Sequence, residues 1–388
     1  MKLLIVGHSY LIAGAQDKFV TMKKLDSNLQ LRLLTWRKTN HLFMRYKREI
    51  NPALTQEEVV SIRDMFSKSH MTYILDPVCL IRLFRQFRPD HIHIEEDPHS
   101  LVAVETVLLA RLFCREATIS FFIWDNLGRI PSFPLNILKK VFAKFSLSNC
   151  SLVVCGNAEA GQLLAKKGYC GKQLTLPQVG FVQEEYATPV QPQLRRQFVG
   201  QDEVLIGFLG RLVPEKGVML LLKALASLKH LPWKLLICGS GPLEKEIQED
   251  WQPFYGSRLI LRKAILHKEV AEYLKCLDIF VLPSYGTTFW KEQFGMTLGQ
   301  AMMAGVACVG SSSGAIPEVL GPGGLVFREG DVVSFASTLE RLLQSKTERE
   351  QFGRKGRKFA MQHYTNYKVS AAYLEAFAHL QESGGGNV

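Results

Sequence analysis

The stretch that decides the fold is Val204–Gly217, which reads VLIGFLGRLVPEKG in a chain of 388 residues. Its first six residues have the apolar composition of a buried strand, and the apolar segment 218–228 that follows predicts a helix. Glycines at the turn between them permit a ligand to approach the backbone, and the first amides of a helix attract anions. With Arg211 and Lys216 as added cations, this turn predicts a diphosphate site. The alternative is an ordinary turn with surface charges.

Two later turns favour the same interpretation. The sequence Gly239-Ser240-Gly241-Pro242 follows a predicted strand at 233–238 and precedes a helix, although such a turn is weak evidence alone. Further on, a loop after Pro283 leads to Glu292-Gln293-Phe294-Gly295 and to a predicted helix at 296–304. A lone glutamate in a loop is usually a solvated surface residue, but this one adjoins a helix start and glycine-backed amides. The three segments together predict one pocket with a carboxylate, cations and free amides.

Short apolar strands alternate with longer amphipathic segments along the chain, which is typical of βαβ units and parallel sheets. Between 184 and 199, proline and glutamine replace the apolar periodicity, so this segment predicts a linker between domains at 1–183 and 200–355. A helical segment runs from 348 to about 380, with a break near Tyr364-Thr365-Asn366. The predicted strands are 2–6, 31–35, 91–95, 118–123, 151–155, 173–179, 204–209, 233–238, 258–262, 278–282 and 306–310.

The charge is positive and unevenly distributed. The chain carries a net charge of +11, and residues 1–150 hold 21 Lys and Arg against 14 Asp and Glu. This balance favours anionic partners, but no nucleic-acid-binding motif accompanies it, so we expect none of that class. The segments 78–88 and 135–147 predict basic amphipathic helices. Each is either a sheet-covering helix with a solvated basic face or a contact with an anionic membrane surface.

The composition excludes several classes of protein. A 47% hydrophobic and 21% charged chain is an ordinary globular α/β mixture, not a disordered, collagen-like or coiled-coil one. The 8 cysteines are scattered without a CxxC pair and predict reduced thiols. The sequence shows neither a signal peptide at its start nor an apolar run of about 18 residues, so we expect a cytoplasmic protein.

The three glycine-containing segments resemble the C-terminal domain of the retaining glycosyltransferases of family four, which have the GT-B fold. The resemblance implies an α/β protein of two facing Rossmann-like domains, whose last segment, 356–388, crosses back to pack on the first. It implies that Arg211 and Lys216 bind the donor diphosphate and that Glu292 contacts the transferred sugar. The further donor contacts that it implies are Gly14, Gly210, Gly241, Phe294, Gly295 and Gln300.

This sequence departs from the family pattern at two places. Gln300 stands where the family has a second glutamate for the ribose hydroxyls, so one carbonyl acceptor remains but the charge is lost. We expect weaker nucleotide binding or an altered donor preference. The run Phe121–Asn126 also lacks the histidine that many relatives carry near the sugar. On the acceptor side, the polar candidates are Glu95, His99 and Asp125.

The function that the resemblance implies is transfer of a sugar from a nucleotide-sugar to a hydroxyl of a glycan or lipid-linked acceptor, with retained configuration. We expect no cofactor and no metal ion, because no Asp-x-Asp motif is present and cations with helix amides would neutralise the leaving diphosphate. The expected setting is surface polysaccharide or glycolipid synthesis, with the protein attached peripherally to the inner face of the cell membrane. One alternative is a non-catalytic nucleotide-sugar-binding partner subunit. An NAD-dependent oxidoreductase is disfavoured, since no G-x-G-x-x-G follows the strand 2–6.

Overall fold

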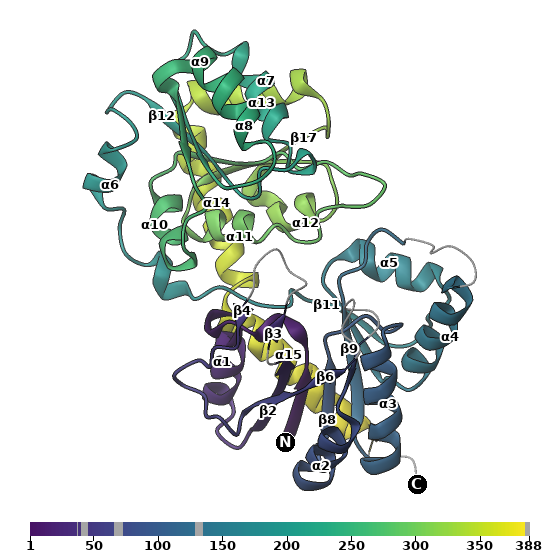
Figure 1. The fold of residues 1–388 in the computed structure, drawn as a ribbon. Helices are drawn as coiled ribbons and strands as arrows, with labels where there is room; N and C mark the ends of the chain where they lie inside the picture. The colour runs from purple at the N-terminus through teal and green to yellow at the C-terminus, as the bar shows by residue number, and fades with distance from the viewer. Residues whose placement is uncertain (37, 40–45, 66–72, 129–134, 385–388) are drawn as a thin grey trace. The chain divides into compact units, whose positions relative to one another are not determined.

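The computed structural model of the protein describes residues 1–36, 38–39, 46–65, 73–128 and 135–384. The chain forms two compact units (Figure 1), and the boundary between them is crossed twice. Unit 1 consists of Met1–Gly180 and Asn366–Val388, and unit 2 consists of Phe181–Thr365.

Unit 1 is a seven-stranded parallel sheet of order β11-β10-β9-β8-β1-β2-β5 with helices on both faces. Helices α2, α3 and α5 pack on one face, and α1 and α15 pack on the other. The strands are β1 (Lys2–Val6), β2 (Gln30–Trp36), β5 (Val59–Ile62), β8 (His91–Ile94), β9 (Thr118–Ile123), β10 (Leu152–Cys155) and β11 (Gln173–Thr175). The helices are α1 (Asp17–Leu25), α2 (Pro77–Phe87), α3 (Leu101–Phe113), α4 (Leu135–Ser148), α5 (Ala158–Lys166) and α15 (Asn366–Gly384). Two short antiparallel pairs lie outside the sheet: β3 (Lys38–Thr39) pairs with β4 (Tyr46–Lys47), and β6 (Asp64–Met65) pairs with β7 (Ile74–Leu75).

Unit 2 is a six-stranded parallel sheet of order β14-β13-β12-β15-β16-β17. Every residue of its central strand β12 is buried, because helices cover both faces of a parallel sheet (Figure 1). The strands are β12 (Val204–Leu209), β13 (Trp233–Cys238), β14 (Leu259–Arg262), β15 (Ile279–Leu282), β16 (Ala307–Ser311) and β17 (Gly324–Phe327). The helices include α6 (Pro192–Arg196), α7 (Val218–Ala226), α8 (Glu244–Glu246), α9 (Gln252–Tyr255), α10 (Val270–Lys275), α11 (Met296–Met303), α12 (Ile316–Leu320), α13 (Val332–Gln344) and α14 (Lys346–His363).

The boundaries of the units differ from the predicted ones at both crossings. The segment 184–199, predicted as a linker, belongs to unit 2, because Arg195 of α6 donates to Asp278 at 2.8 Å and to the carbonyl of Cys276. The return to unit 1 comes at Asn366, not at 356, since α14 remains in unit 2 through His363. The predicted helix break at 364–366 is confirmed, and α15 is the segment that packs on unit 1.

A buried charged cluster links α1, β8 and Gln178, which lies near the end of the first segment of unit 1. The ammonium of Lys18 lies 3.0 Å from Glu95 Oε1 and donates to the carbonyl of Gln178 at 2.6 Å. Glu95 also accepts from Gln178 Nε2 at 2.6 Å and from the Tyr10 hydroxyl. From α15, the ring of Tyr373 covers the ammonium at 4.4 Å, so the last helix closes the cluster.

Two buried histidines continue this polar row along β8. His91 and His93 are both within hydrogen-bond distance of the Ser120 hydroxyl, at 2.8 and 2.7 Å, and both rings contact Phe377 of α15. Burial lowers the pKa of each histidine below 6.5, and for His91 the neighbouring His93 adds to the effect. The folded protein therefore holds neutral imidazoles at a pH where the unfolded chain becomes protonated.

We predict that the resistance of the protein to urea falls as the pH is lowered through 6.5. Below this pH the unfolded chain binds protons that folded His91 and His93 do not, so each group costs about 1.4 kcal/mol per pH unit until its folded pKa is reached. His8 acts in the opposite sense, because Glu96 outweighs burial and raises the pKa of His8. Urea midpoints between pH 5 and 8 measure the balance, and His91→Gln should flatten the profile. An unchanged midpoint across this range would contradict the prediction.

Two further sequence expectations concern cysteines and membranes. All eight cysteines are free thiols, and four of them are buried, as in a reduced core. Within the described ranges, no helix combines the length and the apolar character that crossing a lipid bilayer requires.

Candidate functional site

The predicted diphosphate turn lies at the carboxyl end of β12. A short 3₁₀ helix, Pro214–Lys216, leads through Gly217 into α7. Gly217 has a φ of +73°, and a Cβ there would lie 2.0 Å from the carbonyl oxygen of Pro283. Only glycine fits both conditions, so this residue allows the β12 turn to touch the loop that follows β15.

That second loop is an ordered structure that presents Glu292 beside the β12 turn. The amide of Tyr285 donates to the carbonyl of Glu215 at 3.0 Å, which fastens the start of the loop. Thr287 shapes its tip, since the Thr287 hydroxyl accepts from the amide of Trp290 at 2.9 Å. At the end of the loop, Ala315 donates to the carbonyl of Glu292 at 3.1 Å. The backbone of the loop that carries Glu292 is thus fastened at its start and at its end.

The central contact of the site is an ion pair between residues 76 positions apart in sequence. Lys216 Nζ lies 2.6 Å from Glu292 Oε2, and the two side chains are 16% and 8% exposed. The Ser284 hydroxyl donates to the same carboxylate oxygen at 3.0 Å. The Lys216 ammonium also lies 4.7 Å from the centre of the Trp290 ring. A cation and a carboxylate are therefore fixed together at the carboxyl ends of two neighbouring parallel strands, where ligands bind in open α/β sheets.

Helix α11 begins at Met296, four residues after Glu292. Gly295, at its N-cap, has a φ of +79°, a conformation that favours glycine. Phe294 is 6% exposed, and its ring packs edge-on against Tyr364. Gln300, the residue at the position of the family's second glutamate, is buried and 7% exposed.

The remaining donor-side candidates of unit 2 lie on the turns after β12 and β13. Gly210 follows β12 and donates to Cys238, and Arg211 next to it is exposed. Gly241 lies against the backbone of Leu212, which accepts from the amide of Leu243. The two turns are thus joined by backbone hydrogen bonds around Arg211.

On the acceptor side, the structure distinguishes Glu95 from its neighbour Glu96. His91, His93 and Glu95 point to the face of β8 that α15 covers, and Glu95 is 3% exposed within the Lys18 cluster. Burial would raise the pKa of Glu95, but Lys18, His93 and Tyr10 outweigh it and lower this pKa to about 2. Glu95 is therefore ionised and buried, and its oxygens already accept hydrogen bonds from Lys18, Tyr10 and Gln178. This geometry does not support the prediction that Glu95 contacts the acceptor.

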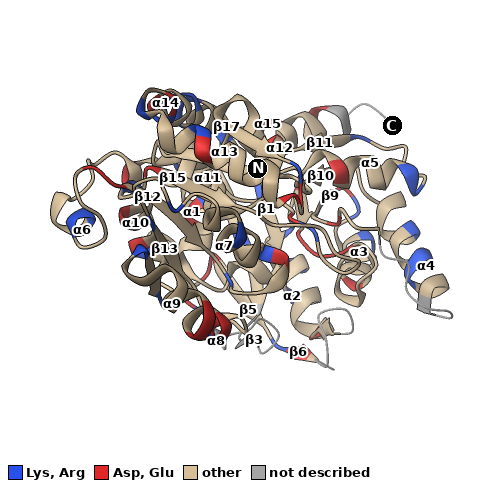
Figure 2. Ribbon diagram, turned by 90° about the horizontal axis from the view of Figure 1, so that it is seen from above, with Lys and Arg blue, Asp and Glu red and all other residues tan. Residues whose placement is uncertain are grey.

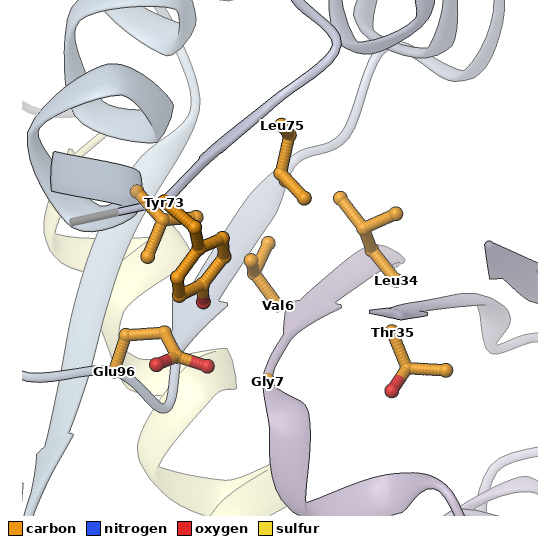
Figure 3. A pocket seen from close by; sticks show the side chains of 8 residues that line it. Val6, Gly7, Leu34, Thr35, Tyr73, Leu75 and Glu96 are labelled. Atoms are coloured by element: carbon orange, nitrogen blue, oxygen red, sulfur yellow. The ribbon is translucent and has the colours of Figure 1, made fainter. Parts of the chain in front are cut away.

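Glu96 faces the other side of the sheet and lines a small pocket, because side chains alternate along a strand (Figure 3). One of its oxygens accepts from the His8 amide at 2.9 Å and lies 2.8 Å from His8 Nδ1. His8 follows β1 and Glu96 follows β8, and the chain order reverses between these two strands. The pocket is lined by Val6, Gly7, Leu34, Thr35, Tyr73, Leu75, Glu96 and Val102.

The other candidates of unit 1 lie apart from this pocket lining. Asp125 Oδ1 accepts from the amides of Leu127 and Gly128, and Lys167 lies 3.0 Å from its other oxygen, so Asp125 caps a turn. Burial raises the pKa of Asp125, but Lys167 and the two amides outweigh this effect and lower it. His99 is half-buried, and burial lowers its pKa. Gly14 is exposed in a 3₁₀ turn, Ala13–Gln16.

Four residues of these sites were not predicted from the sequence. Ser284 and Trp290 contact the Lys216–Glu292 pair, and His8 and Glu96 form the pair at the unit 1 pocket. Ser284 lies two residues after the end of β15, which is a usable signal. Trp290 carried no such signal, because its contact depends on the fold of the loop. Among the residues that the structure describes, no three His, Cys, Asp or Glu side chains are grouped as a metal site.

Comparison with curated proteins identifies relatives that transfer sugars. The chain is 23% identical over 304 residues to sulfoquinovosyl transferase SQD2 of Arabidopsis thaliana, covering 75% of this chain and 57% of that protein. It is 29% identical over 164 residues to the capsular polysaccharide biosynthesis glycosyltransferase CapM of Staphylococcus aureus, covering 40% and 41%. The chain spans about half the length of the curated relatives it matches.

Solved structures share the fold at low sequence identity. HepE of Anabaena in complex with UDP matches with a TM-score of 0.71 at 15% identity, covering 98% of this chain and all of that one. Sucrose-phosphate synthase of Thermosynechococcus elongatus matches with a TM-score of 0.70 at 16% identity, covering 99% of this chain and 100% of that one. These likenesses confirm the predicted GT-B fold. The model of the family described as glycosyl transferases group 1 matches residues 190–359, so the segment that contains Arg211, Lys216, Glu292 and Gln300 is similar to this family.

Proposed function

We propose that this protein is a retaining glycosyltransferase that moves a sugar from a nucleotide-sugar to a hydroxyl of a glycan or lipid-linked acceptor, without a metal ion. The observation that supports this most is the Lys216–Glu292 ion pair with Ser284. Leaving diphosphates gain negative charge in the transition state, and preplaced cations and amides stabilise that charge most effectively in a site with little water. HepE, which shares the fold, was crystallised with UDP.

The roles of the residues follow from their chemistry. Lys216 and Arg211 neutralise the leaving diphosphate, together with the amides at the start of α7. Glu292 accepts hydrogen bonds from the hydroxyls of the transferred sugar and holds its reacting carbon in place. The acceptor attacks from the face that the diphosphate leaves, and a phosphate oxygen takes the acceptor proton, which retains the configuration. On the acceptor side, Glu96 and His8 take the place of Glu95, because Glu96 lines the unit 1 pocket and His8 contacts Glu96.

The relatives suggest the setting of the reaction. Sulfoquinovosyl transferase SQD2 is named for the group that it transfers, and CapM is named for capsular polysaccharide biosynthesis. By analogy, this protein takes part in polysaccharide or glycolipid synthesis.

The proposal is tested by adding a panel of nucleotide-sugars to the purified protein and measuring melting temperature and sugar transfer. A donor at 100 times its dissociation constant adds about 2.7 kcal/mol of stability. Transfer should persist in EDTA, and the anomeric configuration of the product should match that of the donor by NMR. Donor binding without transfer to any acceptor would instead indicate a nucleotide-sugar-binding partner subunit. If no nucleotide-sugar shifts the melting temperature, the proposal is wrong.

We predict that Gln300→Glu lowers the donor KM several-fold and leaves kcat nearly unchanged. A carboxylate accepts stronger hydrogen bonds from the ribose hydroxyls than an amide does. Initial rates over a range of donor concentrations measure both constants, with Gln300→Ala as the variant that should raise the KM. Loss of donor binding in a folded Gln300→Glu protein would mean that Gln300 does not face the ribose.

A further inference from the structure

Helix α4 of unit 1 exposes the aliphatic side chains that a sheet-covering helix would bury. Ile137, Leu138 and Val141 are 55%, 49% and 56% exposed. Toward the end of the helix, Ser146 is buried, and Phe145 and Leu147 pack against the core of unit 1. The sequence periodicity predicts an amphipathic helix here, but the periodicity alone does not show which face of the helix packs on the sheet. In the structure, an aliphatic ridge of Ile137, Leu138 and Val141 faces away from the core.

Lysines border this ridge. Lys140 and Lys144 are exposed on the same side of α4, and Lys139 is half-buried. The helix contains no acidic residue, and in Figure 2 its ribbon carries blue without red. No carboxylate in the described parts of the chain lies within salt-bridge distance of Lys140 or Lys144. The surface therefore combines exposed apolar area with cations that have no protein partner there.

We infer that α4 is a docking surface for an anionic lipid bilayer. A helix of this type lies in the plane of the membrane interface, with its aliphatic side chains among the upper acyl groups and its lysines at the headgroups. Lysine stems reach past the apolar ridge to keep the ammonium in the headgroup layer. The first 150 residues carry +7 of the net charge, which attracts the same surface.

The same observations disfavour other partners. Two copies that paired through α4 about a twofold axis would bring their lysines together without a carboxylate between them. A nucleic acid would engage the lysines but leave Ile137, Leu138 and Val141 in water. Only a partner that is both anionic and apolar satisfies the whole surface. This inference does not rest on the proposed function, because binding to vesicles is measured without donor or acceptor.

The test is cosedimentation of the full chain with vesicles of equal parts phosphatidylglycerol and phosphatidylcholine, and with pure phosphatidylcholine. At low salt, the protein should bind the anionic vesicles at least 10-fold more strongly than the neutral ones. Added salt should weaken this binding without abolishing it, since the aliphatic contribution is not screened. Lys140→Glu with Lys144→Glu, and separately Ile137→Ser with Leu138→Ser and Val141→Ser, should each lower the partition coefficient at least 10-fold.

Two matched controls identify the surface. Arg82→Glu with Lys223→Glu makes the same change in net charge at exposed positions of α2 and α7, and Val78→Ser removes a 64% exposed aliphatic side chain from α2. Both should bind nearly as the parent does. The inference is overturned if the parent stays in the supernatant, if both α4 variants bind as the parent does, or if the controls lose binding equally. Concentration-dependent dimers that the aliphatic variant abolishes, with no vesicle binding, would assign α4 to a second copy instead.

Discussion

Replacing Lys216 with alanine is expected to slow sugar transfer by about 100-fold or more at saturating donor. The variant removes a cation that is already held 2.6 Å from Glu292, at the point where the leaving diphosphate gains charge. Deleting one preorganised charge-stabilising group typically costs 10²- to 10³-fold in rate. Arg211→Ala should give a loss of similar size. Single-turnover rates with a confirmed donor measure the chemical step directly, because product release does not contribute to them.

The controls for this prediction lie in the same unit. Lys223→Ala removes an exposed lysine from α7 and should leave the rate unchanged. Thermal unfolding of the Lys216→Ala protein shows whether the fold is retained, and the Ser284 hydroxyl still donates to Glu292 in this variant. A folded Lys216→Ala protein with the parent's rate would remove Lys216 from the donor site.

Replacing Lys18 with methionine is expected to destabilise the protein by about 3–5 kcal/mol. The Lys18 side chain is 1% exposed and that of Glu95 is 0% exposed, so the substitution leaves a carboxylate in the interior without its cation. Removing one partner of a buried ion pair lowers the free energy of unfolding by about this amount, whereas removing both charges lowers it far less. The melting temperature should fall by about 10 °C, since 1 kcal/mol corresponds to about 2–4 °C in a unit of this size.

The double variant Lys18→Met with Glu95→Gln separates the charge effect from simple loss of packing. It should regain at least half of the lost stability, because Tyr10 and Gln178 still hydrogen-bond a neutral amide at position 95. Equal melting temperatures for the single variant and the parent would contradict the buried ion pair. Equal losses in the single and double variants would attribute the effect to packing alone.

The fold was predictable because its signals are local. Fully apolar runs such as Val204–Leu209 form buried parallel strands with few alternatives, and glycine at a strand end marks a turn toward a helix. The strands β5 and β17 were missed, and neither has a continuous buried pattern. The predicted pocket of unit 2 followed from the same logic, because the carboxyl ends of parallel strands share one edge.

The features that could not be predicted from the sequence depend on which face of a helix or strand other elements cover. Glu95 and Glu96 are adjacent, and their roles differ because α15 covers one face of β8 while the pocket lies on the other. The sequence predicted one pocket for Lys216 and Glu292 but not their direct contact, because the two residues are 76 positions apart and no local pattern encodes their distance. The exposure of the aliphatic ridge of α4 could not be predicted either, because a buried and an exposed aliphatic stripe on a helix repeat with the same period.

The position of α15 has a consequence for synthesis of the chain on the ribosome. Unit 2 is continuous in sequence, whereas unit 1 begins with residues 1–180 and is completed by Asn366–Gly384, which are made after the whole of unit 2. Until this last helix leaves the ribosome, Phe19, Lys18 and the β8 histidines lack the Tyr373 and Phe377 rings that cover them. The half that is translated first is therefore the half that finishes folding last, and a nascent chain halted before residue 366 leaves an apolar and charged surface open to chaperones.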